Sequence, residues 1–242
     1  MRFEDIFKAK KAVIGMIHLA GLTSEKIFEQ AKREIAQMYA AGVDAVLVEN
    51  YFGSTDDVIR VLAYLQENYP DQVYGVNILG DFARSYELAQ RYGRSFMQVD
   101  SICGNLNPTA DRKYAEMIAK TRENGKPVFV LGGVRFKYQP VRSGRSLEED
   151  LRLGMERCDA IVVTGSGTGV NTDIEKIKTF RQILGDFPLI VGAGMTAETC
   201  QEQLSVSNGA IVGSYFKKDG RTEQAVDPQR LDTFMEQVQA IR

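Results

Sequence analysis

Residues 159–171, DAIVVTGSGTGVN, place a β-branched apolar run directly before a glycine-rich loop. Gly165, Gly167 and Gly169 are separated there by small hydroxyl residues. Glycine lets backbone N–H groups come close to an anion, so a loop of this kind after a strand is typical of a phosphate site. Two folds use such loops, the open dinucleotide-binding sheet and the (β/α)8 barrel.

The same apolar run recurs along the chain. Each run is followed by an amphipathic stretch of helical period, which indicates alternating strands and helices and therefore a parallel sheet. Eight such units in 242 residues fit a (β/α)8 TIM barrel, with a doubly wound open sheet as the alternative. No linker divides the chain, so we expect one barrel domain over residues 1–242. The eight runs begin near Val13, Ala45, Tyr74, Met97, Val128, Ile161, Ile190 and Ile211.

The dinucleotide interpretation of the glycine loop fails on its context. Val170 stands where the third fingerprint glycine belongs, and the loop follows the sixth predicted strand rather than the first. The next strand ends in Gly192, where an acidic residue for the ribose is expected. The loop is therefore interpreted as one of eight barrel loops that together bind a small anion.

Composition excludes several classes of function. The formal net charge of −2 gives no support for nucleic-acid binding, and no apolar run is long enough to span a bilayer. Three dispersed cysteines and the lack of a signal peptide predict a cytoplasmic protein. The single histidine argues against a Ser/His/Asp triad, and no Cys/His cluster suits zinc. We expect no cofactor and no metal, with a magnesium site on Glu49, Asp81 or Asp100 as the alternative.

Polar residues interrupt the apolar runs where the predicted strands end, which is where (β/α)8 barrels carry their chemistry. Glu49 and Asp100 are candidate general bases, and Lys137 is a candidate anion partner or electrophile. His18 completes the predicted catalytic set, with a packing role as its alternative. The residues predicted to contact substrate are Asn50, Asn77, Asp81 and Thr164; Asp81 has a helix cap as its alternative.

Three late segments, VTGSGTG, VGAG and VGSYFKKDG, are rich in glycine and small hydroxyl residues. Barrels often form a phosphate site from the loops after strands seven and eight. The alternative is that small residues only relieve crowding at the barrel mouth. The predicted phosphate-binding residues are Gly165, Ser166, Gly167, Gly192, Gly194, Gly213 and Ser214.

Local signals place several helix ends and one long loop. Ser54 with Asp57, and Ser146 with Glu149, indicate helix N-termini, as does Asp227 before a proline. The segment GGVRFKYQPVRSGRS, residues 132–146, is the longest loop-like stretch and is a candidate lid. Glycines near helix ends predict left-handed residues at Gly42, Gly93, Gly125 and Gly185.

Several segments together resemble the BtpA family, which is named for a photosystem I biogenesis protein. They are VIGMIHLAGL, AGVDAVLVENYFG, CDAIVVTGSGTG, LIVGAGMTAE and GAIVGSYFKKDG, and the resemblance extends from about residue 12 to the C-terminus. It implies a barrel similar to the ribulose-phosphate-binding type and, from other members, a link to sugar utilisation. The chain departs from the family pattern in three places. Only Asp81 remains of an Arg-Asn-Asp motif, Asp100 replaces Asn, and Tyr138 replaces His after Lys137.

Two functions follow as hypotheses. The first is an enzyme acting on a phosphorylated sugar-like or nucleotide-like molecule, with lyase, isomerase and transferase chemistry all open. The second, implied by the family name, is a non-catalytic assembly factor for a membrane complex that contacts the membrane peripherally. In either case we expect a homo-oligomer that binds no nucleic acid.

Overall fold

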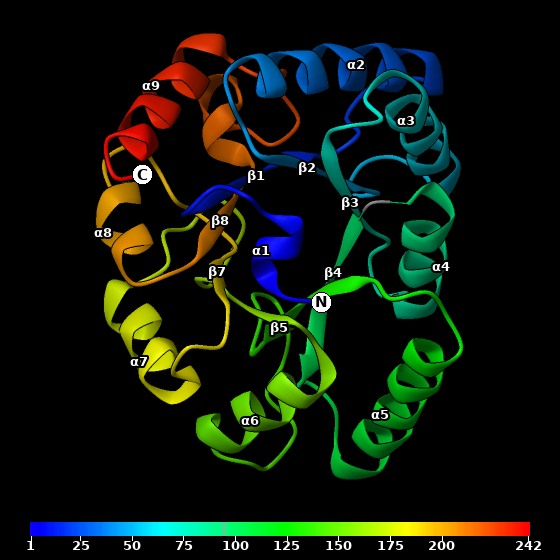
Figure 1. Cartoon of the computed structure of the whole chain (residues 1–242), viewed down its shortest axis with the longest axis vertical. Coiled ribbons are helices and arrows are strands. Elements are labelled where there is room, and N and C mark those ends of the chain that lie inside the picture. The colour runs from blue at the N-terminus through cyan, green and yellow to red at the C-terminus, as the bar shows by residue number, and fades with distance from the viewer. Residues whose placement is uncertain (94) are drawn as a thin grey trace.

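The computed structural model describes residues 1–93 and 95–242, and its eight strands form a closed parallel barrel in the order β1 to β8 (Figure 1). The predicted (β/α)8 fold is therefore confirmed. In six of the eight runs, the expected start lies within one residue of the observed one; Met97 and Ile211 each lie two residues inside the strand. The strands are β1 (Ala12–Ile17), β2 (Ala45–Glu49), β3 (Val73–Asn77), β4 (Ser95–Cys103), β5 (Phe129–Val134), β6 (Ala160–Val163), β7 (Leu189–Val191) and β8 (Gly209–Val212).

Helices surround the barrel as an outer ring (Figure 1). The ring helices are α2 (Ser24–Ala40), α3 (Thr55–Asn68), α4 (Phe82–Tyr92), α5 (Pro108–Glu123), α6 (Leu147–Arg157), α7 (Ile174–Leu184), α8 (Cys200–Ser205) and α9 (Pro228–Gln239). Two short 3-10 turns, η1 (Ser214–Phe216) and η2 (Lys218–Gly220), follow β8. Apolar faces of the ring helices pack on the outward side chains of the strands and form the larger of two buried clusters.

The barrel interior forms the second apolar cluster, and α1 (Phe3–Ile6) covers its amino-terminal end. Figure 1 shows α1 in the centre of the ring, over the strands. Phe7 lies 5.2 Å from Phe96 and 6.2 Å from Phe129, measured between ring centroids. Because this end is filled by aromatic rings, any open site in the barrel lies at the opposite, carboxyl end.

The predicted helix starts are confirmed. Ser54 with Asp57, and Ser146 with Glu149, both form capping boxes, and Asp227 caps α9. The expectation of left-handed glycines near helix ends holds at three positions, with φ of 84° at Gly42, 33° at Gly93 and 58° at Gly185. It is wrong at Gly125, because α5 ends in a right-handed Asn124 and the glycine follows with an ordinary backbone.

Strand β4 extends beyond Asp100, which was expected to end it. Its pairing with β5 shifts between Val99 and Cys103, so the strand has a β-bulge around Asp100. A Cβ atom on Gly133 of β5 would lie 2.0 Å from the Asp100 carbonyl oxygen. Glycine at 133 therefore allows the bulge, which sets the position of the Asp100 side chain at the carboxyl end of the barrel.

Candidate functional site

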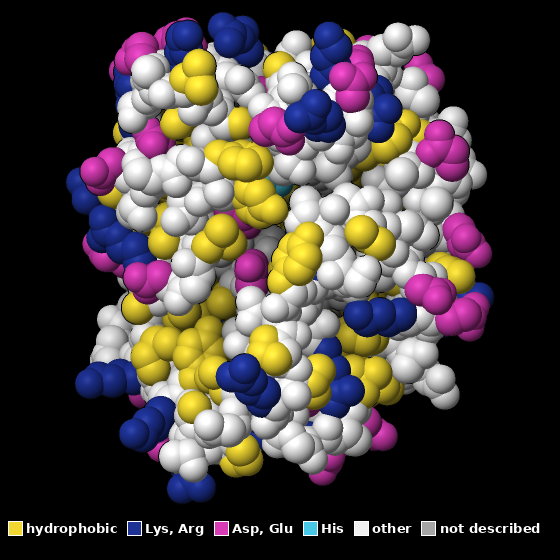
Figure 2. All heavy atoms as spheres, turned by 180° about the vertical axis from the view of Figure 1, so that it is seen from behind, with side chains coloured by type: hydrophobic (Ala, Val, Ile, Leu, Met, Phe, Trp, Pro, Cys, Tyr) yellow, Lys and Arg dark blue, Asp and Glu magenta, His cyan; other side chains and the backbone are white. Residues whose placement is uncertain are grey.

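A cavity of about 190 Å³ opens at the carboxyl ends of the strands. Figure 2 shows this side of the molecule, where hydrophobic side chains border a central hollow and acidic side chains are visible within it. Below, this space is called the mouth cavity. It is lined by Met16, His18, Glu49, Tyr51, Leu79, Gln98, Asp100, Phe136, Lys137, Tyr138, Gln139, Thr168, Gly169, Gly192, Ala193, Gly194, Ile211, Gly213 and Ser214.

Two carboxyl groups meet in the mouth cavity through one amide. Asn77 Nδ2 donates to Glu49 Oε2 at 2.6 Å and to Asp100 Oδ1 at 3.1 Å. Gln98 Nε2 also donates to Asp100 Oδ1, at 3.3 Å. Glu49, Asn77 and Asp100 lie at the ends of, or within, three adjacent strands, β2 to β4. Glu49, Asn77, Gln98 and Asp100 are called the mouth cluster below.

The mouth cluster retains a proton near neutral pH. Burial and the negative charge of Asp100 raise the pKa of Glu49 to about 8. Burial also raises the pKa of Asp100, although the hydrogen bond from Asn77 opposes that shift. Glu49 is therefore protonated at neutral pH beside a second carboxyl whose pKa is also raised, an arrangement that suits acid and base roles.

Lys137 supplies positive charge beside these carboxyls. Its charge partly offsets the rise in the pKa of both Glu49 and Asp100. In the part of the chain that is described, no ion pair within 4.0 Å joins Lys137 to either carboxyl. The Lys137 backbone N–H donates to Thr164 Oγ1 at 2.8 Å, which fixes the start of the loop after β5. The ammonium group thus lines the cavity without being neutralised by a direct partner.

His18 follows β1 and is 4% exposed. Burial, together with the charges of Lys217 and Lys137, holds the pKa of the imidazole well below its ordinary value, so the ring is neutral at neutral pH. Its edge packs against the Tyr51 ring, with 5.4 Å between centroids. Nδ1 forms no hydrogen bond to any described residue. The structure therefore places a neutral imidazole in the cavity wall.

The predicted phosphate residues divide into two groups. Those after β7 and β8 line the mouth cavity, whereas Gly165, Ser166 and Gly167 do not. Crowding explains much of the glycine content: a Cβ on Gly194 would lie 2.0 Å from the Val170 carbonyl oxygen, and one on Gly213 would lie 2.6 Å from His18 Cε1. The anion-binding role of these residues stays a prediction.

Three predicted substrate residues hold the rim together. Asn50 Oδ1 accepts from the Leu79 N–H at 2.8 Å, which ties the loop after β2 to the loop after β3. Asp81 caps α4 by accepting from the Arg84 N–H at 2.9 Å. Thr164 is fully buried beneath the Lys137 loop. None of the three lines the mouth cavity, whereas Asn77 reaches it through its two carboxyl partners.

Sequence reasoning missed Gln98 and Tyr51, both of which line the mouth cavity. A usable signal existed for Gln98, because it precedes Asp100 by two residues in the same strand and so points to the same face. It also missed a buried ion pair beside the site, in which Lys217 Nζ lies 2.6 Å from Glu34 Oε2. Lys217 follows η1 and Glu34 lies in α2, and spacing in the sequence does not predict their contact.

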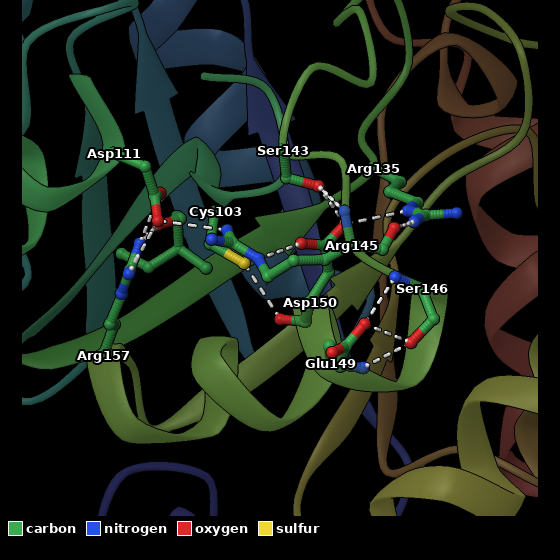
Figure 3. Close-up of polar contacts among 10 residues, drawn as sticks. Cys103, Asp111, Arg135, Ser143, Arg145, Ser146, Glu149, Asp150 and Arg157 are labelled. Atoms are coloured by element: carbon green, nitrogen blue, oxygen red, sulfur yellow. Dashed lines mark hydrogen bonds and ion pairs between the residues drawn. The ribbon is translucent and has the colours of Figure 1, made fainter. Parts of the chain in front are cut away.

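A second set of buried charges supports the loop after β5 (Figure 3). It is called the Arg–Asp network and consists of Asp111, Arg135, Arg145, Asp150 and Arg157. Arg135 and Arg145 donate through Nε to the two oxygens of Asp150, at 3.0 and 2.9 Å. Asp111 accepts from Arg145 at 3.0 Å and from Arg157 at 2.8 and 3.0 Å. The loop predicted as a lid is thus attached at its base to α5 and α6.

Further along this loop, Tyr138 reaches the glycine-rich loop after β6. The Thr168 N–H donates to the Tyr138 hydroxyl at 2.8 Å, and Tyr138 is 70% exposed. Tyr138 adopts a left-handed backbone with φ of 61°. This contact joins two loops across the edge of the mouth cavity, at the position where the family pattern has histidine.

Two other features are absent from the described residues. Among the described residues, no three His, Cys, Asp or Glu side chains are grouped as a metal ion would require. None of the described helices is both long and apolar enough to cross a membrane.

Comparison with known proteins gives the family. The BtpA family model matches residues 9–240. The chain belongs to the BtpA family. It is 28% identical to an uncharacterized protein of Methanocaldococcus jannaschii, over 91% of this chain and 92% of that one. It is 25% identical to the photosystem I biogenesis protein BtpA of Synechocystis, over 95% of this chain and 88% of that one.

Solved structures confirm the barrel. A KDPG aldolase from Legionella pneumophila superposes with a TM-score of 0.63 at 14% identity, over 96% of this chain and 95% of that one. At this level of identity the similarity concerns the fold. The reaction must be inferred from the mouth cavity of this BtpA-family member.

Proposed function

We propose that this BtpA-family protein is an enzyme that acts on a phosphorylated small molecule bound in the mouth cavity. The observation that carries the proposal is the carboxyl pair Glu49–Asp100, bridged by Asn77 and exposed to a cavity that also contains the Lys137 ammonium. Buried carboxyls with opposed protonation states are uncommon outside functional sites, because their burial costs free energy.

The roles follow from charge and position. Asp100, as the carboxylate, removes a proton from the substrate, and Glu49, as the acid, returns one. Lys137 stabilises negative charge that develops on a carbonyl or enolate oxygen. The neutral His18 in the cavity wall donates or accepts one hydrogen bond through Nδ1. This set suits proton abstraction next to a carbonyl group, the step shared by isomerases and many lyases.

The phosphate end is assigned to the loops after β7 and β8. Gly194, Gly213 and Ser214 line the cavity, and Lys137 adds a positive charge. Gly192 is a weaker candidate, since its N–H donates to the Val163 carbonyl at 2.8 Å. Small backbone-lined sites of this kind are common at this position in barrels.

Anion binding tests the proposal most simply. Calorimetric titration with sulfate is expected to give one site per chain, and Lys137→Met is expected to weaken it about tenfold, a loss of about 1.4 kcal/mol. Lys178→Met is the matched control, because Lys178 is exposed on α7 and pairs only with Glu175 among the described residues. Equal affinity in the wild type and both variants would place the anion elsewhere and contradict the proposal.

One observation favours the second hypothesis, an assembly factor. Tyr51, Phe52, Tyr138 and Val170 are exposed apolar residues in the loops around the mouth, and such a surface suits a protein partner. A cell that lacks the gene should then be restored by Glu49→Gln and Lys137→Met but not by Tyr51→Ser with Phe52→Ser. The enzyme proposal predicts instead that neither Glu49→Gln nor Lys137→Met restores the cell.

A further inference from the structure

The floor of the mouth cavity contains a buried acceptor that no described protein group satisfies. Gln98 is 4% exposed and lines the cavity, and its side-chain oxygen Oε1 has no hydrogen-bond partner in the described chain. Its paired neighbour in β5, Leu131, is apolar and belongs to the barrel interior. An amide at this depth is costly unless both its oxygen and its nitrogen form hydrogen bonds.

The orientation of this amide is determined by its neighbour. Nε2 donates to Asp100 Oδ1 at 3.3 Å, and turning the amide over would direct Oε1 at the same carboxylate oxygen. Oxygen facing oxygen is repulsive, so Oε1 faces away from Asp100 and takes a donor from another source. The same end of the cavity holds the carboxyl groups of Glu49 and Asp100.

The two ends of the cavity therefore differ in hydrogen-bonding character. The β2–β4 side presents acceptors from Gln98 and Asp100 beside the protonated Glu49, whereas the opposite side offers donors from Lys137 and Ser214. Thr168 Oγ1 is buried without a described partner as well, which marks a second unused polar group beside the cavity. A complementary ligand carries donors at one end and an anion at the other.

We propose that the ligand is a polyhydroxylated, sugar-like phosphate, with one of its hydroxyl groups donating to Gln98 Oε1. This rests on the proposed function for the anionic end and adds a specificity residue at the other end. A hydroxyl group suits the floor better than an aromatic base for two reasons. It fits the small cavity of about 190 Å³, and the acceptor oxygens at the floor lie close together.

The test compares three probes on two proteins. Inorganic phosphate, ribose 5-phosphate and 2-deoxyribose 5-phosphate are titrated by calorimetry into the wild type and Gln98→Met, which keeps the length of the side chain and removes its polar atoms. We expect the wild type to bind ribose 5-phosphate at least about tenfold more tightly than phosphate, and the advantage to fall below about threefold in Gln98→Met. Phosphate affinity should be the same in both proteins.

Three outcomes separate the possibilities. An advantage of ribose 5-phosphate that survives in Gln98→Met, or its absence from the wild type, would overturn the role of Gln98. If phosphate binds to neither protein, the proposed function is contradicted. The affinities of the two sugar phosphates can still be compared between the wild type and Gln98→Met. If the 2-deoxy sugar binds the wild type as weakly as phosphate does, the hydroxyl at carbon 2 is the donor.

A structural effect of the substitution is separated by two checks. Gln98→Glu keeps an acceptor oxygen at this site and should regain part of the ribose 5-phosphate advantage at pH 5.5, where added carboxyls are more readily protonated. Gln203→Met is the matched control, since Gln203 is also buried with an unpartnered Oε1 but lies outside the mouth cavity. It should leave the ratio of the two affinities unchanged; a ratio altered as much as in Gln98→Met would contradict the assignment.

Discussion

Two groups of buried acidic residues lie on adjoining parts of this barrel, and their surroundings differ in one respect. Asp111 and Asp150 in the Arg–Asp network each accept from two arginines. Glu49 and Asp100 in the mouth cluster share the amide of Asn77, and Asp100 also accepts from Gln98. Neither has an ion pair among the described residues. Paired charges fix a loop in place, whereas unpaired carboxyls keep a proton that chemistry can use.

The pKa directions follow the same division. Hydrogen bonds and charge from Arg157 and Arg145 hold the pKa of Asp111 below its ordinary value against the opposing effect of burial. Burial and a neighbouring carboxyl raise the pKa of Glu49 to about 8. The comparison teaches that burial alone does not decide the state of a carboxyl in this protein; the number of cations within reach does.

The largest effect is expected from removing one charge in each group. Asp150→Asn leaves Arg135 and Arg145 without their carboxylate and should lower the free energy of unfolding by about 3 kcal/mol. This loss is at the low end of the range for broken buried ion pairs, because both arginines are partly exposed. Asp100→Asn removes a charge that lacks a cation partner and should cost less than about 1 kcal/mol. Urea denaturation at pH 7 measures both. Equal losses would break the comparison.

Stability against pH is expected to identify Glu49 as the group that retains its proton. The folded pKa lies above the unfolded one, so the folded protein binds more protons and loses stability as pH rises from about 4.5 to 8. Glu49→Gln removes this loss. The variant should therefore gain stability relative to the wild type through that window and show no further gain above about pH 9. A difference that is the same at pH 5 and pH 9 would contradict the assignment.

The affinity for sulfate should also respond to the titration of Glu49, with a smaller effect than on stability. Ionised Glu49 places a negative charge beside the cavity, so wild-type affinity should fall several-fold between pH 7 and pH 9. Sulfate is chosen because it does not titrate in this range. In Glu49→Gln the affinity should stay constant over that interval; a parallel fall in the variant would assign the effect to another group.

The smallest effect is expected at the edge of the cavity. Tyr138→Phe removes the hydroxyl that accepts from the Thr168 N–H but keeps the ring. Because the Arg–Asp network still holds the base of the loop, the stability change should stay within about 0.5 kcal/mol. Sulfate should dissociate faster, by about threefold, in stopped-flow measurements. An unfolding loss as large as that of Asp150→Asn would show that Tyr138, rather than the network, fixes the loop.

The sequence predicted the fold well because its signals are local. Eight β-branched runs and the caps at Ser54, Ser146 and Asp227 each report on a few neighbouring residues. It also placed Glu49, Asp100, Lys137 and His18 at one end of the barrel, where all four line the mouth cavity. That agreement follows from one rule, that the carboxyl ends of parallel strands meet.

The remaining features depend on contacts between distant segments. No spacing shows that Arg145 reaches Asp111 of α5 or that Lys217 pairs with Glu34 of α2. Nor does a glycine-rich loop show which way its backbone turns, so its sequence does not reveal that Gly165 and Gly167 lie outside the lining of the mouth cavity. Gln98 is different, since the two-residue period of a strand could have placed it beside Asp100 although it was missed.

The protonation state of Glu49 is the central claim, and it can be measured directly. Glutamate labelled with ¹³C at the side-chain carboxyl gives one resonance per residue, and comparison with Glu49→Gln assigns the signal of interest. We expect this resonance to titrate with a pKa of about 8. A Glu49 carboxyl that ionises between pH 4 and 5, as exposed glutamates do, would contradict it.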